Sequence, residues 1–432
     1  MSENKAIYSL FATHYLLITN LLRYMPVLYI YPVSSPICQS RNKIIESLLE
    51  KFNSKSIEFK LLNDIDNRKN PFAFLILTGG SEHEVISLVK HIEDPVLFIA
   101  HPEENSFPAS LEILGKLSQM NRKGKIILVN EKGSTLEELK NSIKIMETAE
   151  KLKHSKTGLI GNPSQWLVAS SPDTNTITGT WGPEIIKVPV KELIEETEQI
   201  DDREAGIHAE EFSRKGETTI EPDMKEILKA VKIYIGTKKI VERYNLQSIT
   251  MECFKLLNDL HSTGCYAMSR LNDEGIIAGC EGDLPGTLTM TWMYYLTGEI
   301  PFMANPQDID IDNNILWIAH CTIARKLLKS YIIRSHFESS TGVALQGKIK
   351  KGPVTLGRIG GEDLKKVSVT NGTIIENEIN ENRCRTQLKL KLEDSVKYFL
   401  KNPLANHHIM IRGHHASLLT EYYNFIIRNQ EF

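Results

Sequence analysis

Short apolar runs that alternate with helix-length amphipathic segments constrain the fold of this chain more than any other feature. Between residues 26 and 151 the apolar runs are 27–31, 72–77, 96–100 and 125–129, and the amphipathic stretches between them include 43–52, 82–91 and 111–120. Strands and helices that alternate at this spacing form a parallel sheet with helices on its faces. The sequence therefore predicts a doubly wound α/β domain at residues 26–153.

The same pattern starts again near residue 155. Expected strands at 157–163 and 185–190 are followed by an expected acidic helix at 191–199. This repetition predicts a second doubly wound α/β domain at residues 154–335. It is the domain in which we expect the candidate metal ligands to lie.

Two segments inside this second domain need separate interpretation. Residues 199–218 are strongly charged, and we expect them to form a solvated connection with some helix. Apolar residues recur at helical spacing in 224–244 and 246–258, which predicts a helix in each.

After about residue 335 the sequence pattern changes to short expected strands separated by glycine-containing turns. The expected strands are 342–347, 354–359, 366–369 and 387–392, and Asn371-Gly372 is a hairpin signal. The pattern predicts a small antiparallel, barrel-like β domain at residues 336–432.

Composition narrows the class of partner. A chain of 432 residues with a net charge of −3 is long enough for several domains and carries no basic stripe. We therefore expect a small-molecule ligand and no nucleic acid. The six cysteines form no CxxC pair, which is typical of reduced thiols in a cytoplasmic protein.

The apolar stretch at residues 7–31 raises the question of a membrane segment. His14, Arg23 and Pro26 interrupt it, so we expect neither a membrane-spanning helix nor a signal peptide. Residues 1–25 are expected to be an N-terminal appendage to the first domain.

The segment around Glu281 carries the richest chemistry. It follows an expected strand at 275–278 and precedes an expected helix at 287–296, so Glu281 falls at the carboxyl end of a parallel strand, where open α/β sheets bind ligands. The alternative is a plain turn in which Asp283 caps the next helix.

Two further clusters add histidine and amide groups. Asn305 to Asp310 follow an expected strand, and His320 ends the apolar run 315–320. Four histidines then lie at residues 407, 408, 414 and 415 around a short apolar strand. Such a cluster is either a metal site or a coincidence of surface residues, and spacing leaves both open.

These residues resemble the motifs of the fucose/arabinose isomerase superfamily, most closely its L-fucose isomerase-like branch. Glu281-Gly-Asp283 matches the metal-binding glutamate of the family, with Leu296-Thr-Gly298 at the family spacing. Asn406-His407 and His320 match two metal-binding histidine positions, and Gly413-His414 follows as in fucose isomerases. The resemblance spans roughly residues 155–430.

The resemblance implies a metal-dependent aldose–ketose isomerase that acts on a pentose or deoxyhexose through an enediol intermediate. Mn²⁺ or another divalent metal would be held by Glu281, Asn305, His320 and His407 and would act as a Lewis acid. His414, Arg385 and Gln387 fall at positions near the substrate hydroxyls. A homo-trimer or homo-hexamer is also implied.

One position departs from the family. Asn305 stands where the family has a second carboxylate, and an amide cannot accept a proton at neutral pH. We expect Asp308 or Asp310 to replace it beside Glu281 as catalytic groups. The competing hypotheses are a sugar-binding or regulatory protein that has lost its base, and a metal enzyme that acts on a modified sugar.

Two cysteines and one tryptophan are interpreted as packing residues. Cys280 and Cys321 adjoin proposed ligands, and alternation along a strand predicts that their side chains point to the opposite side. Trp166 is expected in the core.

Overall fold

A computed structural model describes residues 25–52, 56–129 and 135–428. The chain divides into two compact units, with the boundary between Glu147 and Thr148. Each unit is described by itself. Of the expected appendage at residues 1–25, all but Met25 lies outside the described residues.

Unit 1 is built on a five-stranded parallel sheet in the order β2-β1-β3-β4-β5. Its strands are β1 (Val27–Val33), β2 (Glu58–Leu61), β3 (Phe72–Ile76), β4 (Val96–Ala100) and β5 (Gly124–Leu128). Its helices are α2 (Arg41–Phe52), η1 (Ile65–Asn67), α3 (Glu82–Val89), α4 (Ser106–Gln119) and α5 (Thr135–Lys153), the last of which continues past Glu147. This strand order is one of the two common doubly wound arrangements, as predicted.

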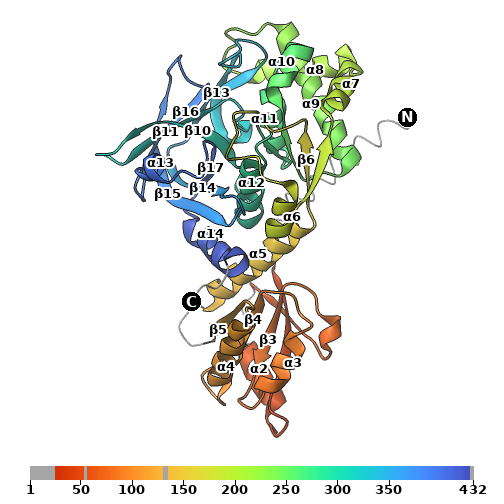
Figure 1. Cartoon of the computed structure of the whole chain (residues 1–432), viewed down its shortest axis with the longest axis vertical. Helices are drawn as coiled ribbons and strands as arrows, with labels where there is room; N and C mark the ends of the chain where they lie inside the picture. Colours follow the sequence, from red (N-terminus) through yellow and green to blue (C-terminus); the bar gives the residue numbers. More distant parts are fainter. Residues whose placement is uncertain (1–24, 53–55, 130–134, 429–432) are drawn as a thin grey trace. The chain divides into compact units, whose positions relative to one another are not determined.

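Burial explains why these strands were visible in the sequence. Every residue of β3 and β4 is buried, because central strands of a parallel sheet are covered on both faces. Helix α4 packs against β3, β4 and β5 (Figure 1). Phe74 and Phe98 stack inside this layer with ring centroids 5.8 Å apart.

Unit 2 contains a second parallel sheet, in the order β7-β6-β8-β9. Its strands are β6 (Lys156–Ile160), β7 (Glu184–Val188), β8 (Ser248–Met251) and β9 (Ile277–Gly279). The helices of this part are α6 (Thr174–Trp181), α7 (Val190–Glu198), α8 (Asp202–Lys215), α9 (Met224–Tyr244), α10 (Cys253–Leu260), α11 (Cys265–Asp273) and α12 (Leu284–Thr297).

Some helix was expected in residues 199–218 and is present, but it is more extensive and less solvated than predicted, and the prediction of one helix at 246–258 was wrong. The charged segment 199–218 is mostly the regular helix α8, which Asp201 caps and which buries Ala205, Ala209 and Phe212 on one face. Residues 246–258 are not one helix, because β8 intervenes. The strand was not predicted because Ser248 and Thr250 are polar residue types, although both are buried in the structure. The Ser248 hydroxyl hydrogen-bonds the Thr157 hydroxyl at 2.7 Å.

Six antiparallel strands close a barrel in the order β10-β11-β16-β15-β14-β17. They are β10 (Phe302–Asp310), β11 (Ile315–His320), β14 (Gly352–Gly360), β15 (Lys366–Glu378), β16 (Thr386–Leu392) and β17 (His408–Arg412). A separate antiparallel pair consists of β12 (Leu328–Arg334) and β13 (Ala344–Ile349). The remaining short elements are η2 (Arg325–Leu327), α13 (Tyr398–Lys401), α14 (Ala416–Tyr422) and the π-helix η3 (Tyr423–Ile427).

The barrel was predicted in kind but not in detail. Strands β10 and β11 precede residue 336, where the sequence analysis began a β-rich domain. The hairpin signal Asn371-Gly372 was wrong, since both residues lie inside β15. A Cβ on Gly372 would lie 2.8 Å from the Lys391 carbonyl oxygen, so close strand packing accounts for this glycine.

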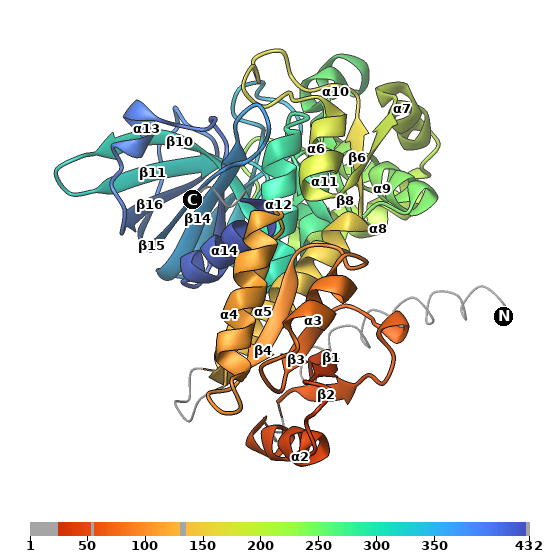
Figure 2. The ribbon, with the colours of Figure 1, turned by 60° about the horizontal axis from the view of Figure 1, so that its bottom comes forward.

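Helix α12 joins the two halves of unit 2. It contacts β8 and β9 of the parallel sheet and β10, β14 and β17 of the barrel, and Figure 2 shows it between these two layers. Most of its residues are buried, including Trp292. The loop that precedes α12 carries Glu281 and therefore faces the barrel. Within the described residues, no helix is long and apolar enough to cross a membrane.

Candidate functional site

Strand register in the barrel gathers three of the predicted ligands. Asn305 of β10 pairs with Ala319, next to His320 at the end of β11. Ala304 of β10 pairs with His408, next to His407 at the start of β17. Residues 102 positions apart in sequence are thus neighbours across adjacent strands.

Glu281 reaches the same place from the parallel sheet. It follows β9 and has a φ of 62°, a left-handed conformation that is uncommon for a residue with a side chain. Its carbonyl oxygen accepts a hydrogen bond from the Ser164 backbone N–H at 2.8 Å. Its carboxylate accepts one from Trp166 Nε1 at 2.6 Å. Trp166 is 53% exposed, so the prediction that it lies in the core was wrong.

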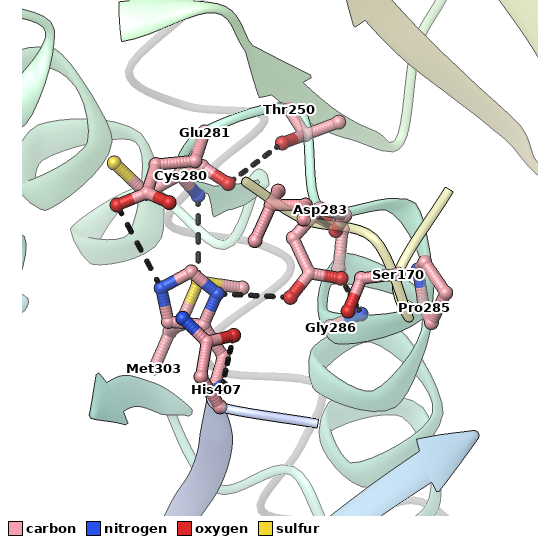
Figure 3. A network of polar contacts seen from close by, with 12 residues as sticks. Ser170, Thr250, Cys280, Glu281, Asp283, Pro285, Gly286, Met303 and His407 are labelled. Carbon is pink, nitrogen blue, oxygen red and sulfur yellow. Dashed lines mark hydrogen bonds and ion pairs between the residues drawn. The ribbon is translucent and has the colours of Figure 1, made fainter. Parts of the chain in front are cut away.

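A buried ion pair between Asp283 and Arg358 orients His407, and Figure 3 shows the contact between Asp283 and His407. Asp283 and Arg358 are both fully buried, and Arg358 Nη1 lies 2.9 Å from Asp283 Oδ2. The same Asp283 oxygen is 2.9 Å from His407 Nδ1. Burial alone would raise the pKa of Asp283, but the Arg358 charge and the His407 hydrogen bond outweigh it and lower that pKa. Asp283 is therefore a carboxylate that accepts the Nδ1 proton.

This tautomer leaves the Nε2 lone pair of His407 facing the Glu281 carboxylate. Nε2 is buried, has no hydrogen-bond partner and lies 3.9 Å from Glu281 Oε1. Asn305 Oδ1 is a second buried acceptor without a partner. Acceptors that face one another with no donor between them fit a divalent cation, and the Asp283–His407 contact is the carboxylate support that metal-binding histidines receive.

His320 completes the group of donors. Its Nδ1 lies 3.0 Å from the Thr322 hydroxyl, which leaves Nε2 available, and its ring centroid is 5.5 Å from that of His407. Burial, followed by the charges of His407 and His336, lowers the pKa of His320 well below its usual value. A neutral imidazole is the form that binds a metal ion.

Glu281, Asn305 and His320 border a cavity that is partly open to solvent, whereas His407 is not among its lining residues. None of the described residues that line it is a lysine or arginine. The lining residues are Cys253, Phe254, Leu257, Thr263, Cys265, Cys280, Glu281, Asn305, His320, Cys321, His336, Glu338 and Cys384.

Two cavity residues were missed by the sequence analysis. His336 and Glu338 lie in the loop between β12 and β13. Glu338 is exposed as a whole residue, yet partial burial and the Glu281 charge raise its pKa. Burial, followed by the Arg385 charge, lowers the pKa of His336 to about 4. Neither residue was singled out from the sequence, and the fold reveals that both line the cavity.

Asp308 and Asp310 are not brought to the cavity. Asp308 is exposed and pairs with Arg383 at 3.1 Å. Asp310 accepts hydrogen bonds from the backbone and side chain of Asn313, and those bonds lower its pKa. Neither lines the cavity, so this placement gives no support to the catalytic role expected of them.

The three expected substrate-binding residues also lie outside the cavity lining. His414 is exposed, with Nε2 at 3.1 Å from the Gly372 carbonyl oxygen. Arg385 donates to the Ser335 carbonyl oxygen at 2.8 Å. Gln387 donates to the Asn380 carbonyl oxygen at 2.8 Å. All three side chains are therefore engaged in contacts with the protein backbone.

The prediction for two cysteines was wrong. Cys280 and Cys321 both line the cavity instead of pointing away from it. Glu281 leaves the strand in its left-handed conformation directly after Cys280, so strict alternation does not hold there. A hydrogen bond with Cys253 and burial raise the pKa of the Cys280 thiol.

Comparison with known proteins adds two kinds of match. The family model of the L-arabinose isomerase central domain matches residues 173–298, a segment that includes Glu281 and Asp283 and ends before Asn305. A sulfoquinovose isomerase from Alkalicoccus urumqiensis is 22% identical over 264 residues, which are 57% of this chain and 59% of that protein. Another, from Priestia aryabhattai, is 22% identical over 229 residues, 52% of this chain and 51% of that protein.

The chain spans between about half and three-fifths of the length of these curated relatives. The family model covers the loop of Glu281, which the structure places beside three barrel residues that lie beyond the matched segment. The matches do not show L-fucose isomerase specifically. They indicate the arabinose/fucose isomerase-type superfamily of sugar isomerases.

Proposed function

We propose that this chain is a divalent-metal-dependent aldose–ketose isomerase that acts on an uncharged pentose or deoxyhexose as a homo-trimer or homo-hexamer. The observation that carries the proposal is that two buried acceptors, His407 Nε2 and Asn305 Oδ1, have no hydrogen-bond donor, and that His407 Nε2 lies 3.9 Å from the Glu281 carboxylate. Similarity to the arabinose isomerase central domain and to sulfoquinovose isomerases supports the reaction class.

In this proposal Glu281, Asn305, His320 and His407 hold Mn²⁺ or a similar ion. Carboxylate, amide oxygen and imidazole are ligands that such ions accept. The bound ion would supply Lewis-acid polarisation of the sugar oxygens at the reacting carbons. Asp283 and Arg358 keep His407 in the tautomer that presents Nε2, because the buried ion pair holds Asp283 ionised.

The lining favours an uncharged sugar. The relatives are named for a sulfonated sugar, and a sulfonate would call for a cationic or strongly donating partner. The described lining has no lysine or arginine, and Phe254 and Leu257 form an apolar part of the wall. A sugar end without a charge matches this surface better than an anionic one does.

Glu338 is the group that moves the proton. Isomerisation needs a base that removes a proton beside a carbonyl and returns it to the neighbouring carbon. Asn305 cannot do this, whereas Glu338 lines the same cavity as Glu281 and has no ion-pair partner among the described residues. Its raised pKa makes it a stronger base than an ordinary carboxylate.

Exchange of the sugar C2 proton with solvent deuterium tests this proposal. Purified protein with Mn²⁺ is incubated in D₂O with a panel of aldoses that includes sulfoquinovose, and deuterium in substrate and product is followed by NMR. We expect exchange with a pentose or deoxyhexose. Glu338→Gln should lower the exchange rate by about 10²- to 10⁴-fold while Mn²⁺ affinity stays the same, since only the base is lost.

Asp308→Asn and Asp310→Asn are the matched controls, because both residues lie outside the cavity. They should leave exchange unchanged. Wild-type exchange rates in Glu338→Gln would remove Glu338 from the mechanism. Sugar binding without exchange for every sugar would instead favour the sugar-binding or regulatory alternative. Turnover of sulfoquinovose alone would contradict the proposed substrate class.

A further inference from the structure

The cavity gathers most of the cysteines of the chain. Of six cysteines in the sequence, five line this one cavity, and only Cys38 lies elsewhere. They come from separate segments: α10, α11, the loops after β9 and β11, and the loop before β16. Free thiols pack as small hydrophobes and explain burial, but packing alone does not explain why they border the proposed metal ligands.

Two of these thiols are in direct contact. Cys253 Sγ and Cys280 Sγ lie 3.4 Å apart. Two sulfurs bound to one zinc ion at about 2.3 Å are about 3.8 Å apart in a tetrahedral site, so small side-chain rotations suffice to bring both onto one ion. Cys253 is the first residue of α10.

Oxygen and nitrogen donors lie beside this pair. Cys280, Glu281 and His320 each offer a ligand atom within 4.8 Å of those of the other two. Cys253 lies outside this group of three and contacts it through Cys280, so a rotation of its side chain would add a second sulfur to one oxygen and one nitrogen. Four donors of these types are what zinc and similar thiophilic ions bind tetrahedrally.

We infer that Cys253, Cys280, Glu281 and His320 form a second metal site, selective for a thiophilic divalent ion such as Zn²⁺, Cd²⁺ or Co²⁺. Binding converts two thiols and one M²⁺ ion into a metal dithiolate and two released protons, with no change of oxidation state. The site shares Glu281 and His320 with the set proposed for Mn²⁺. One cavity therefore holds either a hard ion on the barrel side or a thiophilic ion on the thiol side.

Sharing has a consequence for metal selection. Mn²⁺ prefers oxygen and nitrogen donors and binds thiolates weakly, whereas Zn²⁺ favours thiolate. A thiophilic ion should therefore displace Mn²⁺ by taking Glu281 and His320 from it. The inference does not require isomerase activity, since it concerns the donors alone.

Co²⁺ is the probe that reports sulfur ligation directly. Reduced, metal-free wild-type protein is titrated with Co²⁺ at about pH 7, where a thiol of ordinary pKa holds its proton. We expect intense sulfur-to-cobalt charge-transfer bands in the near ultraviolet and release of about two protons for each ion bound. Cys253→Ser and Cys280→Ser should each lose at least half of the band intensity, while Cys38→Ser and Cys384→Ser, one outside and one inside the cavity, should keep it.

Two results of the Co²⁺ titration would overturn the inference: Co²⁺ binding without charge-transfer bands, and bands that persist in both Cys253→Ser and Cys280→Ser.

A displacement experiment on wild-type protein tests the shared ligands. One equivalent of Zn²⁺ should release the bound Mn²⁺, which electron paramagnetic resonance detects as free Mn²⁺. Zn²⁺ and Mn²⁺ bound at the same time would also overturn the inference. If a serine variant fails to fold, the wild-type bands and proton count still decide whether two thiolates bind. Cobalt–thiolate bands in a protein that binds no Mn²⁺ would support this site and contradict the proposed function.

Discussion

The buried polar side chains of the two units differ in one respect: whether they have hydrogen-bond partners. In unit 1, His101 Nε2 bonds the Leu77 carbonyl oxygen at 2.9 Å, and the Ser106 hydroxyl bonds the Ile76 carbonyl oxygen. In unit 2, His407 Nε2 and Asn305 Oδ1 have no partner. Within the described residues, every buried side-chain polar atom without a hydrogen bond lies in unit 2.

This contrast separates a structural polar group from one held ready for a ligand. Burying an acceptor without a donor costs about 1–3 kcal/mol, so such groups persist where a ligand or water satisfies them or where the fold is stable enough to tolerate the cost. His101 and His407 are both buried and both sit near strand ends. Only His407 has a ring nitrogen, Nε2, that lacks a hydrogen-bond partner and lies beside a carboxylate. Substitutions at the two histidines test this difference.

The largest expected effect comes from His407→Ala compared with His101→Ala. Loss of His407 should abolish measurable Mn²⁺ binding, or weaken it by more than about 100-fold, because even a lost supporting contact costs about 10- to 100-fold. His101→Ala should leave Mn²⁺ affinity unchanged and destabilise the protein by about 1–3 kcal/mol, because a buried carbonyl loses its partner. Titration of free Mn²⁺ by electron paramagnetic resonance distinguishes them. An Mn²⁺ affinity in His407→Ala equal to that of the wild type would show that His407 is not a metal ligand.

A smaller effect is expected for the two ion pairs. Asp283→Asn leaves Arg358 buried without its counter-charge and should lower the free energy of unfolding by about 3–5 kcal/mol. Asp94→Asn in unit 1 affects a partly exposed pair with Arg122 and should cost about 1 kcal/mol or less. Urea unfolding followed by circular dichroism gives both values. Equal losses for the two variants would show that burial does not govern these pairs.

Much of the scaffold could be predicted from the sequence because its signals are local. The buried runs at β3 and β4 are continuous apolar segments, and the strand predicted at residues 96–100 has the same first and last residue as β4. Glu281 and His320 follow such runs directly, and the fold puts both at strand ends. Local periodicity and turn position were enough for these.

The remainder depends on contacts between distant segments. Glu338 lies in an irregular loop, and nothing near it in sequence shows that the loop reaches Glu281. The outward direction assigned to Cys280 failed because the backbone turns at Glu281, at a φ of 62°. Asn371-Gly372 satisfies a hairpin rule, yet pairing with β16 keeps it extended. Tertiary structure, not local composition, decides all three.

The smallest expected effect is a pH dependence confined to unit 2. Burial is the main cause that lowers the pKa of His336 to about 4 and of His408 to about 3. Both rings are therefore neutral in the folded protein at pH values where the unfolded chain takes up a proton. Their contribution to stability is fully present above about pH 6.5 and is lost as pH falls from there toward 4 and 3. Each histidine adds a slope of up to about 1.4 kcal/mol per pH unit in that window.

Tryptophan fluorescence follows this loss selectively, because all four tryptophans of the chain, at positions 166, 181, 292 and 317, lie in unit 2. Unfolding free energies measured between about pH 7 and pH 5 should fall as the solution becomes more acidic. His408→Gln should make that fall shallower, since one of the histidines that take up a proton on unfolding is removed. His83→Gln, on the exposed surface of unit 1, is the matched control and should leave the slope of the tryptophan-detected transition unchanged. A slope in His408→Gln equal to that of the wild type would mean that the acid sensitivity of unit 2 has its origin outside β17.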